Sequence, residues 1–255
     1  MKKILHYLSK IFKIFENYGF LNGLQIILKF LLPIDKKINL KNIHSPIYLR
    51  NIVTDKGIFH QVFVELEYDY PFNLDKNPVI IDAGGNIGLF SIFFKNKFPD
   101  SQIIIIEPDS DNFKVSKLNL ESYSNIFYEN SGLWNRKTKI KVYDKYNFGK
   151  SGLVVEEDDK YGNLDAVSIP YLMEKYNLNK IEIVKLDIET SEIELFQENY
   201  TDWILNTKYI VIELHDRIKN GCGMSFFNAI QSTLKNYRFE IRGENIIIEN
   251  LNFKS

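Results

Sequence analysis

One stretch decides the fold of this chain: Val79-Ile80-Ile81-Asp82-Ala83-Gly84-Gly85-Asn86-Ile87-Gly88-Leu89-Phe90-Ser91. It opens with an apolar run, which is typical of a strand that is buried on both faces. Glycines at 84, 85 and 88 predict a tight turn, and the apolar residues that follow recur at helical spacing. We therefore predict a strand, a glycine turn and a helix. In a doubly wound α/β sheet this arrangement brings backbone close to a nucleotide beyond the carboxyl end of the strand.

The spacing within this turn narrows the kind of nucleotide site. Asn86 stands where the dinucleotide-binding fingerprint has its second glycine, and no Lys-Ser or Lys-Thr pair follows to make a P-loop. About 25 residues after Asp82, a run of isoleucines ends in Glu107-Pro108-Asp109, near the offset at which an acid binds a ribose in such folds. We assign Glu107 to the ribose hydroxyls. Asp109 also suits the start of the next helix, because acids favour the positive end of the helix dipole.

Composition and charge limit the class of protein. The chain has 255 residues, of which 45% are apolar, enough for one large α/β domain with an appendage. The formal net charge is −1, so no global field favours nucleic acid as a partner. A single cysteine excludes a disulfide within the chain, and no stretch reads as a secretory signal or a membrane span. We therefore expect a cytoplasmic enzyme.

Residues 1–44 are expected to form a basic helical extension ahead of a nucleotide-binding domain over residues 45–255. Lysines outnumber acids in residues 1–41 by eight to two, a balance of +6 that leaves −7 on the rest of the chain. Two apolar stripes at helical spacing are Ile4, Leu5, Leu8, Ile11, Phe12 and Phe15, and then Leu24, Ile27, Leu28 and Leu31. We interpret them chiefly as surfaces that pack on the same domain or on a second copy in a homodimer. A foot that lies on a membrane surface, at the inner face of the membrane, is the alternative.

Later segments complete the predicted sheet. Ser131 and Gly132 follow the next predicted strand, at a position that lies beside the base of a nucleoside in a doubly wound sheet. Asn147 to Gly152 is expected to be a loop. Near the C-terminus, residues 237–242 and 245–249 predict an antiparallel hairpin. The fold class is therefore a mostly parallel, doubly wound α/β sheet with a C-terminal antiparallel hairpin and an N-terminal helical extension.

Two further strands end in charged residues that should meet at the same edge of the sheet. Lys185, Asp187 and Glu189 alternate at the end of one strand, and Glu213 and His215 do so at the end of the next. Because histidine is the commonest general base, we expect His215 to remove a proton and Asp187 to orient the acceptor or His215.

The same charged residues allow other interpretations. Asp187, Glu189 and Glu213 could hold a divalent cation, since carboxylate oxygens suit Mg²⁺. Glu192 and Asp216 are interpreted as solvated charges or helix-start acids.

Several motifs, taken in order, resemble the FkbM-type methyltransferases. They are Tyr48-Leu49-Arg50 with Thr54-Asp55, Glu67-Tyr68, Asp82-Ala83-Gly84-Gly85-Asn86-Ile87-Gly88, Glu107-Pro108, Lys185-Leu186-Asp187-Ile188-Glu189 with Glu192, and Glu213-Leu214-His215. The resemblance covers about residues 45 to 216 and is specific because the motifs occur together. It implies a class I, Rossmann-like fold that binds S-adenosylmethionine and usually methylates an oxygen of a sugar, lipid-linked glycan or natural product.

The resemblance also implies roles for individual residues. Asp82 and the turn from Gly84 to Gly88 would hold the methionine part of the cofactor, and Glu107 the ribose. The residues on the acceptor side would be Lys185, Asp187, Glu189 and His215. One position departs from the family pattern, because Thr190 stands where the family commonly has glycine.

We therefore expect an S-adenosylmethionine-dependent O-methyltransferase that acts on a hydroxyl of a sugar or of a surface-polysaccharide precursor, such as a capsule or lipooligosaccharide sugar. A nicotinamide-dependent sugar oxidoreductase or epimerase is one alternative, and the missing fingerprint glycine counts against it. The other alternative is a non-catalytic scaffold that associates with membranes through its basic helices.

Overall fold

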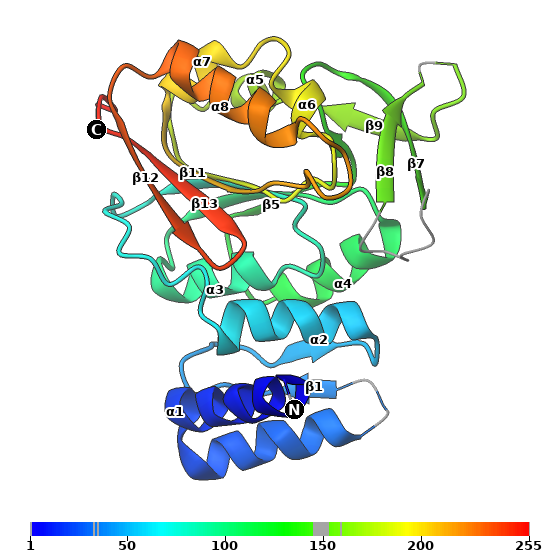
Figure 1. Ribbon diagram of the computed structural model, residues 1–255, viewed down its shortest axis with the longest axis vertical. Helices are drawn as coiled ribbons and strands as arrows, with labels where there is room; N and C mark the ends of the chain where they lie inside the picture. Colours follow the sequence, from blue (N-terminus) through cyan, green and yellow to red (C-terminus); the bar gives the residue numbers. More distant parts are fainter. Residues whose placement is uncertain (1, 33, 35, 145–152, 159, 255) are drawn as a thin grey trace.

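The computed structural model describes residues 2–32, 34, 36–144, 153–158 and 160–254. Its centre is a seven-stranded sheet with the order β12-β13-β11-β10-β3-β4-β5 (Figure 1). The five strands from β11 to β5 are parallel, and β13 pairs antiparallel with both β11 and β12. The strands are β3 (Val79–Ala83), β4 (Gln102–Ile106), β5 (Ile126–Glu129), β10 (Ile181–Leu186), β11 (Thr207–Glu213), β12 (Tyr237–Arg242) and β13 (Asn245–Asn250).

The strand order creates a crevice at the carboxyl end of β3. From β3 the chain moves outward through β4 to β5, then crosses back to place β10 on the other side of β3. Connections after β3 and β10 therefore diverge, and such a switch point is where open α/β sheets bind their ligands. The predicted doubly wound sheet and its C-terminal hairpin are confirmed.

Helices cover both faces of the sheet because its strands alternate buried side chains between two apolar clusters. Ile80, Ile103 and Ile183 belong to one cluster, whereas Ile81, Ile104 and Val184 belong to the other. The first face carries α3 (Leu89–Lys97) and α4 (Ser110–Leu120). The second carries α5 (Ile169–Lys175), α6 (Glu192–Leu195), α7 (Thr201–Leu205) and α8 (Cys222–Thr233), as Figure 1 shows.

The N-terminal segment packs outside the α3 face. The predicted helix pair is present as α1 (Lys2–Leu31), which bends at Gly19, where φ is 74° and ψ is 171°. Its buried residues Ile14 and Ile26 join the same apolar cluster as α3, so the extension shares a core with the domain. The segment continues through β1 (Lys36–Ile38), β2 (Ile47–Leu49), α2 (Val53–Phe59) and a π-helical turn, η1 (His60–Val64).

A second, four-stranded sheet was not predicted from the sequence, although the alternation of residues from Thr138 to Tyr143 predicts one of its strands. Its order is β6-β9-β7-β8, and its strands are β6 (Gly132–Leu133), β7 (Thr138–Asp144), β8 (Leu153–Glu157) and β9 (Leu164–Val167). The loop expected from Asn147 to Gly152 lies outside the described residues.

The sequence from Glu189 to Gln197 predicts a helix directly after β10, but the helix there is short. It is α6, which begins only at Glu192. Glu189 and Thr190 have φ angles of 45° and 76°, in the left-handed region, so the chain turns before the helix can start. For the β-branched Thr190 this backbone is strained.

Candidate cofactor and acceptor site

The glycine turn after β3 is built so that backbone lies against backbone. The amides of Gly84 and Gly85 both donate to the carbonyl of Ile106, at 3.0 Å each. Gly84 has a φ of 70°, and a Cβ there would lie 1.7 Å from the carbonyl oxygen of Asp187. No side chain fits at this position, so glycine is what lets the turn after β3 pack directly against the backbone after β10.

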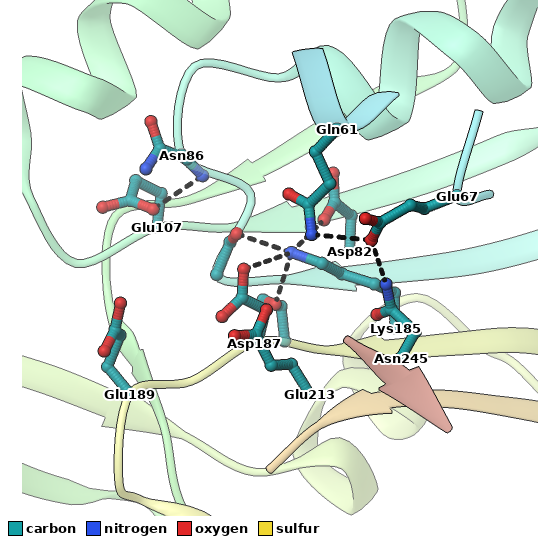
Figure 2. Close-up of polar contacts among 12 residues, drawn as sticks. Gln61, Glu67, Asp82, Asn86, Glu107, Lys185, Asp187, Glu189, Glu213 and Asn245 are labelled. Carbon is teal, nitrogen blue, oxygen red and sulfur yellow. Dashed lines mark hydrogen bonds and ion pairs between the residues drawn. The ribbon is translucent and has the colours of Figure 1, made fainter. Parts of the chain in front are cut away.

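Glu107 lies at the end of β4 and is tied directly to this turn. Its Oε2 accepts from the amide of Asn86 at 2.7 Å (Figure 2), and its Oε1 accepts from the amide of Asp109 at 2.9 Å. Burial raises the pKa of Glu107 to about 7. Oε1 also accepts from the side-chain amide of Asn112 at 3.5 Å, whereas Oε2 keeps a second lone pair for a ribose hydroxyl, so the structure is compatible with the predicted role. Asp109 caps α4 by accepting from two backbone amides, as expected of a helix-start acid.

The residues predicted beside the adenine follow β5 at the same edge of the sheet. The Oγ of Ser131 is buried and has no hydrogen-bond partner among the described residues, and Gly132 begins β6. Asn130 donates to the carbonyls of Glu107 and Pro108, at 2.8 and 3.3 Å, and so joins the ends of β4 and β5. An unpaired buried hydroxyl is costly, which fits a position that a ligand completes.

Lys185 of β10 points back into the glycine turn. The sheet register pairs it with Asp82, and its Nζ donates to the carbonyls of Gly84, at 2.7 Å, and Ala83, at 3.2 Å. Its Nζ also lies 3.4 Å from the Oδ1 of Asp82 and 3.7 Å from the Oδ2 of Asp187. Burial lowers the pKa of Lys185, but the charges of Asp82 and Asp187 outweigh burial and raise the pKa above its ordinary value. The ammonium therefore stays protonated. Lys185 therefore braces the turn and neutralises the acids around it (Figure 2).

His215 stands opposite, at the end of β11, with three carboxylates around one ring nitrogen. Its Nε2 lies 3.7 Å from the Oδ1 of Asp187, 3.8 Å from the Oε2 of Glu189 and 3.7 Å from the Oε1 of Glu213. The predicted convergence of these strand ends is confirmed as geometry. None of the three distances is a hydrogen bond, so the Nε2 side is open to a partner.

Glu192 holds the other nitrogen of His215 and was misread from the sequence. We interpreted it as a solvated or helix-start charge, and it does begin α6, but its side chain is 0% exposed. The Nδ1 of His215 donates to the Oε1 of Glu192 at 2.5 Å. This bond fixes the tautomer that leaves Nε2 free to accept a proton. Asp216 is exposed and accepts from the amides of Gly221 and Gly223, as expected of a loop acid.

The crowding of charges shifts three pKa values in this cluster. Burial lowers the pKa of His215, but the hydrogen bond to Glu192 and the charges of Glu192 and Asp187 raise it to about 9. Burial and the charge of Asp187 raise the pKa of Glu189 to about 8 and that of Glu213 to about 7. Groups with strongly shifted pKa values in a crevice are typical of catalytic sites.

The cluster also has the spacing of a cation site. One ligand atom each from Asp187, Glu213 and His215 lie within 4.8 Å of one another. The sequence had suggested Glu189 in place of His215. Glu189 is not part of this group of ligand atoms, although its Oε2 lies 3.8 Å from the Nε2 of His215.

Residues far apart in the chain support this edge and were not found from the sequence. Glu67 accepts from Gln61 and from Asn245, at 3.2 Å each, so the π-helical turn and the C-terminal hairpin meet there (Figure 2). Arg50 pairs with Asp55 at 2.7 Å and donates to Asn112 of α4 at 2.7 Å. A small cavity of about 20 Å³ lies among η1, the glycine turn and β10. Arg50, Asp55 and Glu67 belong to motifs that resemble the family, but the resemblance did not say which residues they contact.

This strand order, with a glycine cradle after β3, an acid after β4 and an orphaned hydroxyl after β5, defines a class I S-adenosylmethionine-dependent methyltransferase. The residues present therefore fit the cofactor. The family model for the methyltransferase FkbM domain matches residues 82–241, and the chain belongs to this family. This assignment decides against the nicotinamide-dependent alternative.

Three similar proteins illustrate the relationship. Methyltransferase sdnD of Sordaria araneosa is 29% identical over 174 residues, which cover 55% of this chain and 67% of that protein. Methyltransferase 1 of Beauveria bassiana (strain ARSEF 2860) is 28% identical over 188 residues, or 62% of this chain and 73% of its own. The crystal structure of methyltransferase FkbM from Methylobacillus flagellatus KT has the same fold, with a TM-score of 0.51 and 15% identity over 72% of this chain. This chain covers 47% of that protein.

Proposed function

We propose that this methyltransferase transfers a methyl group to a hydroxyl oxygen, and that His215 is the general base. One observation carries the proposal: the Nε2 of His215 lies 3.7 Å from Asp187, which lines the cavity beside the glycine turn, while its Nδ1 is bound to the buried Glu192. A base whose second nitrogen is fixed by a carboxylate has a set tautomer and ring orientation.

Residues on one side of the crevice bind the cofactor, and residues on the other side bind and deprotonate the acceptor. The cofactor supplies an electrophilic methyl carbon on its sulfonium. The turn at Gly84, with Lys185 behind it, and Glu107 would hold and orient the nucleoside, so that its methyl group is aligned with the acceptor oxygen. The Nε2 of His215 takes the hydroxyl proton, and Glu192 stabilises the imidazolium that results.

A polyhydroxylated acceptor, such as a sugar, suits the lining of the acceptor side. Asp187, Glu189 and Glu213 each retain partial exposure and offer carboxylate oxygens next to His215. Carboxylates accept hydrogen bonds from neighbouring hydroxyls, whereas an apolar aromatic acceptor would leave them buried without partners. Within this class we propose a bacterial surface-polysaccharide precursor, which rests on the family resemblance.

Incubation of the protein with a labelled methyl donor and a panel of sugar nucleotides and glycan acceptors tests the proposal. We expect label in an alkali-stable methyl ether of one sugar class. His215→Gln should lower the rate at least a hundredfold, since a positioned base contributes about 10²–10⁴-fold. His44→Gln is the matched control, because His44 is exposed and lies in the N-terminal segment. Methylation of nitrogen or carbon, or full activity of His215→Gln, would contradict the proposal.

The spacing of Asp187, Glu213 and His215 supports a second role for the histidine, as a ligand of a divalent cation. A chelator separates the two roles. If His215 is the base, dialysis against EDTA leaves the rate unchanged. If His215 is a ligand, EDTA abolishes the activity, and added Mg²⁺ or Mn²⁺ restores it.

A further inference from the structure

Exposed apolar side chains gather on the N-terminal helices to an unusual degree. Of the nineteen large apolar residues that are exposed in the described part of the chain, ten lie between residues 8 and 34. They are Leu8, Ile11, Phe12, Phe20, Leu21, Leu24, Leu28, Leu31, Leu32 and Ile34, and we call them the N-terminal apolar face. Single exposed apolar residues are ordinary, but a concentration of this size marks an interaction surface.

This face is what the predicted stripes became in the folded chain. The stripes were expected chiefly to pack on the same domain or on a second copy, yet Leu8, Phe12 and Leu28 are 56%, 69% and 52% exposed in the single chain. A different side of the helices makes the internal contacts. Ile14 and Ile26 are buried, and Tyr18 donates to the carbonyl of Phe63 at 2.6 Å. The helices therefore pack on the domain through these buried residues. The residues of the apolar face are not needed for that packing and remain exposed.

The bend at Gly19 lets both halves of α1 contribute to the face. Phe15 stacks on Phe20 across the bend at 5.5 Å, and a Cβ on Gly23 would meet the ring of Phe15 at 2.7 Å. The two halves therefore lie side by side at one end of the molecule, beyond α2 (Figure 1). None of the described helices combines the length and apolarity needed to cross a bilayer.

The charge of the N-terminal segment distinguishes between two possible partners for this face, a second copy of the chain and an anionic lipid surface. Residues 1–41 carry +6 while the rest of the chain carries −7. Lys13 pairs with Glu65 and Lys36 is buried, but the segment keeps a net positive charge, so a second copy docked through the same face would bring like charges together, which disfavours a symmetric dimer. An anionic lipid surface instead attracts lysines and accepts the apolar side chains between its head groups. Lys37 and Lys41 are exposed and available for such attraction.

We propose that the N-terminal apolar face docks this protein on anionic lipid bilayers. The large apolar side chains enter the boundary between head groups and acyl chains, and the surrounding lysines contact lipid phosphates. The inference concerns a surface outside the catalytic crevice and does not depend on the proposed acceptor.

Vesicle co-sedimentation of the full-length protein tests the proposal. The vesicles contain phosphatidylcholine alone, or equal parts of phosphatidylcholine and phosphatidylglycerol. We expect binding to the anionic vesicles only, and weaker binding as salt is raised. The triple variant Phe12→Ser, Leu21→Ser and Leu31→Ser should lose about tenfold or more in apparent affinity, because it removes three apolar anchors.

A matched control separates this face from general surface apolarity. Met224→Ser, Phe239→Ser and Ile241→Ser remove three comparably exposed residues, 69%, 56% and 66%, elsewhere on the molecule. This variant should bind vesicles like the wild type. Light scattering without lipid is measured for all three proteins, and binding of S-adenosylmethionine confirms that each is folded. Absence of wild-type binding, equal losses in both variants, or a dimer that only the N-terminal variant dissociates would overturn the proposal.

Discussion

Replacing Glu192 with Gln should move the pH dependence of the reaction. The carboxylate of Glu192 lies 2.5 Å from the Nδ1 of His215 and is the chief cause that raises the pKa of His215, to about 9. Glu192→Gln keeps an oxygen that can accept this hydrogen bond but removes the charge. Since a single opposite charge in contact shifts a pKa by about 1–3 units, the pKa of His215 should fall to about 6–8.

The magnitude follows from the fraction of His215 that is neutral. In the wild type, a pKa of about 9 leaves about 1% of the imidazole free to accept a proton at pH 7. The rate should therefore rise about tenfold per pH unit up to pH 9. The variant should be slower on its plateau, because its imidazole is a weaker and less firmly held base, but it should reach that plateau at lower pH. The ratio of variant to wild-type rate should thus increase about 5-fold to 50-fold between pH 9 and pH 7, for a variant pKa of about 8 down to about 6.

The assay is single-turnover methyl transfer across this pH range, with an NMR titration of the imidazole nitrogens as an independent measure of the pKa. Glu198→Gln is the matched control, because Glu198 follows the same helix but its side chain is 51% exposed and pairs with Arg136. Thermal melting confirms that each protein is folded. If Glu192→Gln and the wild type share one midpoint in both measurements, Glu192 does not set the basicity of His215 and the reasoning is refuted.

Three further predictions concern the turn, the strained segment and stability. Gly84→Ala should abolish measurable cofactor binding in calorimetry, because its Cβ would meet the carbonyl of Asp187, whereas Gly19→Ala, with a similar φ of 74° and no atom within 4 Å, should bind normally. Thr190→Gly should be more stable to unfolding than Thr190→Ala by about 1 kcal/mol, because both remove the buried side chain and only glycine relieves the left-handed strain. Chemical denaturation of both variants measures the difference. The pKa values of His215, Glu189 and Glu213 are raised on folding from 6.5, 4.5 and 4.5, so the folded protein binds more protons and its stability should fall as pH rises from about 4.5 to 9. A midpoint in denaturant that rises over this range would contradict the assignment.

Sequence patterns were sufficient to predict the central strands of the sheet, because each is an apolar run that is followed by a glycine turn or by charged residues. Asp82 and Glu107 were expected at one edge, and the 2.7 Å bond from the amide of Asn86 to Glu107 confirms it. Parallel strands with similar registers place their ends together, so the meeting of Asp187 with His215 followed from the same rule.

Other parts of the site depend on packing that no local pattern specifies. Glu192 resembles any helix-start acid, and only the burial of α6 against α8 turns it toward His215. Lys185 was expected on the acceptor side, but the register that pairs it with Asp82 brings its ammonium to the glycine turn. Helical periodicity in residues 1–41 predicted an apolar face, yet periodicity does not say which side of the helix the domain will cover.

The central claim is that several strand ends seat a sulfonium nucleoside opposite His215. A crystal structure with S-adenosylhomocysteine tests it most directly. We predict the ribose on Glu107, the amino-acid part on the turn at Gly84, and the sulfur facing the crevice that the Nε2 of His215 lines. A nucleoside bound elsewhere, or a sulfur separated from His215 by a folded element, would contradict the account.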